Sequence, residues 1–175
     1  LQPWKEVAQL CQEYGIWFHC DDTQWMGKLD PHGFDLCSSF SFSAHKFGGP
    51  KGVGGMFSHE PICWIRGGGQ AKEQRGGTEN FPAIEGMRIA WRQTCNKLTL
   101  KEDTVAWKEK FESQIKQDLP GVRIIGEKVS RLWNTSFLML PDFNNSSWVY
   151  KLDKLGYSLS TGSACSTARK EASEL

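Results

Sequence analysis

Long hydrophobic runs, a surplus of one charge and paired cysteines are all missing from this sequence. No apolar stretch approaches the roughly 20 residues that a membrane-spanning helix needs, and the first residues have the features of neither a secretory signal nor a transit peptide. The formal net charge of the 175-residue chain is only +1, which gives no bulk attraction to nucleic acid or to an anionic membrane. We therefore expect a cytoplasmic protein that binds no nucleic acid and no membrane.

The six cysteines are scattered, and none belongs to a Cys-x-x-Cys pair. This spacing favours neither a disulfide framework nor a zinc site, so we predict no metal and a reducing compartment. With 39% hydrophobic and 23% charged residues, the remaining composition is that of an ordinary globular protein with a sizeable core. The chain begins without methionine and ends abruptly at EASEL, which favours a fragment of a longer protein.

The spacing of apolar residues predicts an α/β arrangement followed by a smaller α+β domain, entered near residues 100–120. Early in the chain, an expected helix carries Val7, Leu10, Cys11 and Tyr14 on one stripe. The elements expected are a helix over 3–14, strands at 16–20, 38–43 and 54–58, two helices between 82 and 116 with a break near 96–101, strand segments within 122–126 and 133–141, a helix over 146–156 and a strand at 157–160.

The segment from Ser38 to Gly55 combines a short apolar strand with a lysine and a glycine-rich turn. Phe40 and Phe42 alternate with serines, and His45-Lys46 is followed by five glycines. Because glycine lets the backbone bend sharply, we expect Lys46 to project from the strand end into a cleft. A partly buried amine loses its proton more easily and can then attack an aldehyde. The alternative is an ordinary surface lysine in a turn.

Three other segments carry groups suited to ligand chemistry. Asp21 follows an expected strand, where open α/β sheets hold ligands, although such a residue is often only a turn or helix cap. The glycine-rich stretch 66–80 offers backbone amides for an anion, or forms a mobile surface loop. Its two RGG triplets also allow RNA binding, but no extended basic tail accompanies them. Cys165 lies among Gly, Ser and Ala on an expected accessible loop, whereas the other five cysteines fit small core positions.

The motifs around Asp21, Lys46 and Cys165, in this order along the chain, resemble those of class V aminotransferase enzymes that use pyridoxal 5'-phosphate (PLP). The resemblance is strongest to cysteine desulfurases of the nitrogen-fixation and iron-sulfur-assembly type. The resemblance implies that residues 1–100 form part of a PLP-binding large α/β domain of fold-type I, with a mainly parallel sheet and flanking helices. It implies that residues 101–175 form a small α+β domain, incomplete at its C-terminus, that carries the catalytic cysteine loop.

The resemblance also implies a role for each matching side chain. The implied roles are Asp21 on the pyridine nitrogen, Gln24 on the ring hydroxyl, Ser43 and His45 on the phosphate, Thr78 on the phosphate of a neighbouring subunit's cofactor, Lys46 as cofactor lysine and proton shuttle, and Cys165 as the nucleophile toward sulfur. Asp22 and Trp25 depart from the pattern, because small residues are expected there.

As activity, the resemblance implies conversion of L-cysteine to L-alanine, with sulfur held as a persulfide on Cys165 and passed to an acceptor protein for iron-sulfur clusters or tRNA thiolation. A homodimer is expected. The family's first half, with its phosphate loop and ring-stacking histidine, and an arginine in its later tail are not among these residues, so this chain alone is not expected to hold a complete active site. A selenocysteine lyase or other class V PLP enzyme, and an inactive truncated scaffold, remain alternatives.

Overall fold

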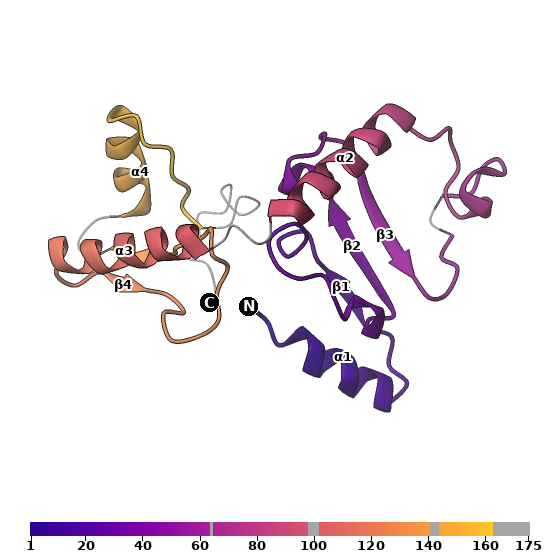
Figure 1. Ribbon diagram of the computed structural model, residues 1–175, viewed down its shortest axis with the longest axis horizontal. Helices are drawn as coiled ribbons and strands as arrows, with labels where there is room; N and C mark the ends of the chain where they lie inside the picture. Colours follow the sequence, from indigo (N-terminus) through magenta and orange to yellow (C-terminus); the bar gives the residue numbers. More distant parts are fainter. Residues whose placement is uncertain (64, 98–101, 141–143, 163–175) are drawn as a thin grey trace. The chain divides into compact units, whose positions relative to one another are not determined.

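A computed structural model describes residues 1–63, 65–97, 102–140 and 144–162 of the chain (Figure 1). The chain divides into two compact units, Leu1–Glu102 and Asp103–Leu175. Within the described ranges, no helix combines the length and the apolar character needed to cross a bilayer. The elements of the first unit are α1 (Trp4–Glu13), β1 (His19–Asp21), η1 (Phe34–Leu36), β2 (Ser39–Ser43), η2 (Ala44–Phe47), β3 (Gly54–Ser58), η3 (Gln70–Glu73) and α2 (Phe81–Lys97).

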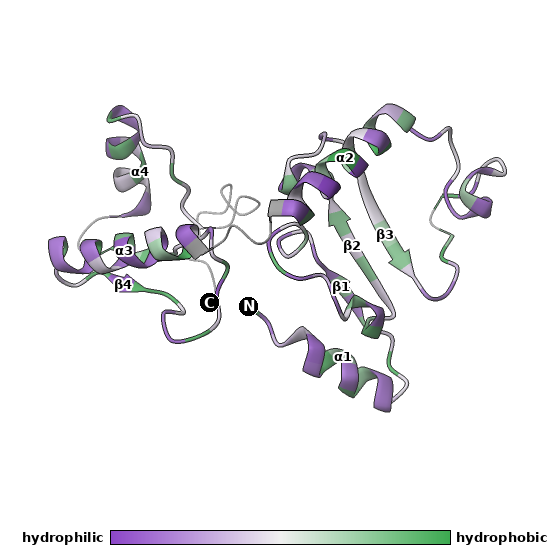
Figure 2. Ribbon diagram, viewed as in Figure 1, coloured by the Kyte–Doolittle hydropathy of each residue, from purple (hydrophilic) through white to green (hydrophobic). Residues whose placement is uncertain are grey.

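The first unit is built on a three-stranded sheet in the order β1-β2-β3. β1 runs parallel to β2, whereas β3 pairs with β2 antiparallel, so the described strands form a mixed sheet. In β2, Phe40 and Phe42 alternate with serines, whereas in β3 the hydrophobic Met56 and Phe57 are adjacent. Hydrophobic positions of both strands are drawn in green in Figure 2. The strand expected at 16–20 instead begins at His19, because the chain pairs with β2 only from that residue onward and leaves Ile16 and Trp17 exposed.

Helix α1 packs through Trp4 and Ala8 rather than through the stripe expected from its long apolar side chains. The ring of Trp4 stacks on Phe34 with centroids 4.5 Å apart, and Ala8 is completely buried. Leu10 and Tyr14 of the expected stripe are exposed. The small Ala8 side chain permits a close approach of the helix, and the large indole buries more apolar surface than either of those residues would.

Helix α2 covers the turn that follows β2. The ring of Trp91 meets Phe47 edge-on with centroids 5.8 Å apart, and the Thr94 hydroxyl donates a 3.1 Å hydrogen bond to the Phe47 carbonyl oxygen. A Cβ atom on Gly86 would lie 2.7 Å from Cγ of Pro50, so glycine allows the helix to lie directly on the glycine-rich loop. This packing holds the lysine-bearing turn η2 against the core.

The second unit combines helices with a two-stranded antiparallel sheet. The carboxylate of Glu112 on α3 is buried and accepts two hydrogen bonds from the Arg131 guanidinium, at 2.7 and 2.8 Å, and one of 2.6 Å from the Ser136 hydroxyl. The strand expected at 157–160 is not formed, since those residues pair with no described strand and the Tyr157 N–H instead turns back to the Leu152 carbonyl oxygen. The elements are α3 (Glu102–Asp118), β4 (Arg123–Ile124), β5 (Leu138–Met139) and α4 (Asn145–Lys154).

Candidate functional site

The carboxyl ends of the parallel strands β1 and β2 place several of the predicted site residues at one edge of the sheet. Asp21 is the last residue of β1 and lies opposite Ser41 of β2. β2 continues two residues further to Ser43 and passes directly into η2, which holds His45 and Lys46. Because ligands of open α/β sheets bind beyond the carboxyl ends of strands, this edge is the candidate site.

The lysine turn is anchored by buried residues on both sides of its polar ones. Ala44 and Phe47 are buried, whereas His45 is exposed and Lys46 is half-buried. The N–H of Gly49 donates a 2.9 Å hydrogen bond to the Ala44 carbonyl oxygen, and a Cβ on Gly49 would lie only 2.8 Å from that of Ala44. The turn can therefore close this tightly only with glycine.

The turn after β1 is held by both side-chain and backbone hydrogen bonds. Oδ1 of Asp21 accepts the Thr23 N–H at 3.0 Å, the turn-forming role that had been the alternative for this residue. Gln24 is exposed, and its side-chain Oε1 accepts a 3.2 Å hydrogen bond from Nζ of Lys28. Gly27 has a positive φ of 75°, and a Cβ there would overlap the Cβ of Phe47, so glycine brings this turn against η2.

Two buried charged residues beside the site were not predicted as functional. Asp22 is 2% exposed, and burial, together with the charge of Asp21, raises its pKa to about 6 although a thiol hydrogen bond from Cys20 opposes the rise. Lys28 is 7% exposed, and burial followed by the charge of Lys46 lowers its pKa. The departure of Asp22 from the expected small residue was a usable signal. Lys28 gave none, because a lysine in a polar loop is normally exposed.

Cys20 and Cys37 are two cysteines whose thiol pKa values are raised. Burial raises the pKa of Cys37 to about 11, and burial together with the neighbouring Asp22 carboxyl raises the pKa of Cys20 still further. Because the thiolate is the reactive form, both residues fit the predicted role of small core side chains.

Thr78 belongs to the segment between η3 and α2 and not to the strand ends that carry Asp21 and Lys46. The segment between β3 and α2, which contains η3, extends away from the three-stranded sheet (Figure 1). Its base is closed by a bridge between Ile65 and Arg75, and the Arg75 guanidinium donates to the carbonyl oxygens of Gly76 and Gly77 at 3.0 and 2.8 Å. Thr78 follows this closed loop and is exposed.

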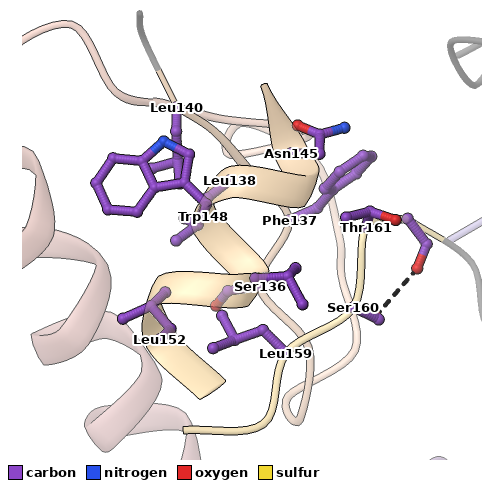
Figure 3. A pocket seen from close by; sticks show the side chains of 12 residues that line it. Ser136, Phe137, Leu138, Leu140, Asn145, Trp148, Leu152, Leu159, Ser160 and Thr161 are labelled. Carbon is purple, nitrogen blue, oxygen red and sulfur yellow. Dashed lines mark hydrogen bonds between the residues drawn. The ribbon is translucent and has the colours of Figure 1, made fainter. Parts of the chain in front are cut away.

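The predicted nucleophile Cys165 lies outside the described residues. The chain leading toward it is described as far as Gly162 and forms one wall of a small pocket of about 120 Å³ in the second unit (Figure 3). Apolar side chains from β5 and α4, among them Leu138 and Trp148, line the other walls. The Ser160 hydroxyl donates a 3.2 Å hydrogen bond to the Gly162 carbonyl oxygen, which tightens the turn at the end of this segment.

Comparisons with known proteins match nearly the whole chain. Residues 1–174 fit the family model described as aminotransferase class V. The chain is 32% identical over 174 residues to a cysteine desulfurase of Sinorhizobium fredii, covering 94% of this chain and 44% of that protein. It is 33% identical over 178 residues to one from Rhodobacter capsulatus, covering 99% and 46%. The X-ray structure of a NifS-like protein from Rickettsia africae superposes with a TM-score of 0.86 at 28% identity, over 93% of this chain and 46% of that one.

The chain therefore belongs to the class V aminotransferase family, and the predicted family resemblance is confirmed. Its fold is an α/β fragment that matches part of NifS-like enzymes, and the family depends on PLP. The chain spans a little less than half the length of the curated cysteine desulfurases that it matches.

Proposed function

We propose that this chain carries the cofactor lysine, Lys46, and the sulfur-accepting cysteine, Cys165, of a PLP-dependent cysteine desulfurase. The observation that carries the proposal is the juxtaposition of Asp21, Ser43 and Lys46 at the carboxyl edge of β1 and β2. The similarity to cysteine desulfurases along nearly the whole chain supports it. Under this proposal, residues 1–100 belong to a fold-type I large domain and residues 101–175 to a smaller α+β domain.

The side chains at the sheet edge fit the groups of PLP. When bound, PLP supplies an aldehyde that amines attack and a pyridinium ring that takes up electrons from the substrate α-carbon. The exposed Asp21 carboxylate would hold the proton on the pyridine nitrogen, since only one of its oxygens is needed for the Thr23 N–H. The Ser43 hydroxyl does not cap η2, and together with the His45 ring N–H it would donate to the phosphate. Gln24 would donate to the ring hydroxyl.

Lys46 and Cys165 would divide the chemistry between them. The Lys46 amine would hold the cofactor and then carry the proton released from the α-carbon of L-cysteine. The Cys165 thiolate would attack the substrate sulfur, so that a sulfur–sulfur bond forms as the carbon–sulfur bond breaks, leaving alanine and a persulfide. An acceptor protein for iron-sulfur clusters or tRNA thiolation would take that sulfur. In a homodimer, Thr78 would reach the phosphate bound by the neighbouring subunit.

The test is sulfur release by the full-length gene product that carries these 175 residues, loaded with PLP and given L-cysteine and a thiol reductant. We expect equal amounts of alanine and sulfide. Cys165→Ala should keep PLP and lower sulfide release by about 100-fold or more. Cys63→Ala, at an exposed cysteine, is the matched control and should leave the rate unchanged.

Sulfide release by Cys165→Ala at the parental rate would show that the proposed nucleophile is wrong. A full-length protein that releases selenide from selenocysteine but no sulfide from L-cysteine would instead favour the selenocysteine lyase. Retention of PLP without turnover of either substrate would identify an inactive scaffold.

A further inference from the structure

We propose that Lys28 is a positioning residue of the candidate site: its buried ammonium fixes the side-chain amide of Gln24 so that the amide NH2 is presented to the ligand. This role rests on the proposed function, in which Gln24 meets the ring hydroxyl of PLP. The motifs identified in the sequence did not include Lys28, and the contacts of its side chain are what point to it.

The hydrogen bonds of Lys28 determine which way the Gln24 amide is turned. Nζ of Lys28 donates to the backbone carbonyl oxygen of Gln24 at 3.1 Å and to its side-chain Oε1 at 3.2 Å. An ammonium has three donors and no acceptor, so the amide must offer its oxygen to Lys28. The NH2 is then directed away from Lys28, and because Gln24 is exposed, that NH2 remains available as a donor.

The local backbone explains how a lysine comes to be buried here. Gly27 has a left-handed backbone and lies so close to Phe47 that a Cβ would overlap that side chain. The turn after β1 is thereby pressed against the lysine turn η2, and Lys28 and Lys46 are near enough for their charges to interact. A buried ammonium is costly unless it is well hydrogen-bonded, and its two bonds to Gln24 contribute to that requirement while also fixing the amide.

An amide NH2 and an amide oxygen favour opposite protonation states of the PLP ring oxygen. The NH2 donates and therefore favours the deprotonated, phenolate form, whereas an amide oxygen accepts and favours the protonated form. Without Lys28, the Gln24 amide is free to turn over. The visible band of bound PLP, which depends on the protonation of its ring oxygen, should then move toward the shorter-wavelength form. A residue that only supports the fold would not cause that change.

The experiment compares Lys28→Met with the parent in the full-length protein. With glutamine selectively labelled with ¹⁵N, the side-chain N–H signals of Gln24 should shift in the variant even before PLP is added. After PLP is added, the proportion of the shorter-wavelength band should rise severalfold, and the PLP dissociation constant should rise about tenfold. Lys110→Met, at an exposed lysine of α3, is the matched control and should behave as the parent.

A second variant keeps the test decisive if Lys28→Met does not fold. Gln24→Glu retains an oxygen for Lys28 but presents a second oxygen in place of the NH2, so it should produce the same spectral change. Unchanged Gln24 signals and an unchanged band in Lys28→Met, or an unchanged band in Gln24→Glu, would overturn the role of Lys28. Failure of the parent itself to bind PLP would overturn the proposed function, while the Gln24 signals without PLP would still report whether Lys28 fixes the amide.

Discussion

The backbone N–H of Asp22 donates a 2.8 Å hydrogen bond to the carbonyl oxygen of Ser41, which locks the first residue beyond β1 to the neighbouring strand. Because side chains alternate along an extended chain, this bond leaves Asp21 exposed at the candidate site and buries Asp22 beneath it. Two adjacent carboxyl groups therefore have opposite environments, one solvated and one desolvated.

Asp22→Asn should make the protein more stable near neutral pH. Burial raises the folded-state pKa of Asp22 from 3.8 to about 6, so between these values the folded chain keeps a proton that the unfolded chain has lost. The free energy of unfolding consequently falls as the pH rises through this window, by at most roughly 3 kcal/mol. Asparagine cannot ionise and avoids this loss. Urea unfolding at pH 4 and pH 7 should show a gain only at pH 7, and a gain equal at both values would contradict the assignment.

Arg131→Met should destabilise the second unit much more than removal of an exposed ion pair. The side chains of Arg131 and Glu112 are only 19% and 8% exposed, and losing the guanidinium leaves a buried carboxylate, at a cost of about 3 kcal/mol at pH 7. Lys116→Met, which breaks the Lys116–Glu127 pair whose side chains are both 45% exposed, is the control and should cost under about 1 kcal/mol. Urea unfolding measures both, and equal losses would contradict this account.

The Arg131–Glu112 ion pair predicts that stability depends on pH with the opposite sign to that of Asp22. Hydrogen bonds from Arg131, with a further one from Ser136, hold the pKa of Glu112 below its usual range. The stabilisation is therefore present above the unfolded-state pKa and is lost as the pH falls through the lower, folded-state value. Arg131→Met should remove this acid-dependent loss, so the penalty of the substitution should shrink as the pH falls. A penalty that is constant with pH would contradict the ion-pair explanation.

Sequence patterns predicted the parts of this fold that depend on local periodicity. The strand at 54–58 and the two helices separated near 96–101 are confirmed, because a short apolar run and helical spacing are properties of the segment itself. The start of β1 and the missing strand at 157–160 depend instead on whether a partner strand runs alongside, which no local pattern encodes. Trp4 and Ala8 became the buried face of α1 because of the aromatic ring of Phe34, a contact made across the fold.

Only those residues of the candidate site that belong to recognisable sequence motifs could be predicted. The Asp21, Lys46 and Cys165 motifs were sufficient to indicate the family, because the three occur together and in the family's order, although each alone would be a weak signal. The burial of Lys28 was not visible, since it arises from the close approach of Gly27 to Phe47. The roles of the individual site residues stay predictions, and Cys165 lies outside the described residues.

The most direct test of the central claim is a visible-absorption titration of the full-length protein with PLP, performed with the parent, Lys46→Ala and the exposed-site control Lys110→Ala. We predict a visible band in the parent and the control that L-cysteine bleaches or shifts, and no such band in Lys46→Ala, because only that variant lacks the amine at the end of β2. A band of equal intensity in Lys46→Ala would contradict the claim that Lys46 holds the cofactor.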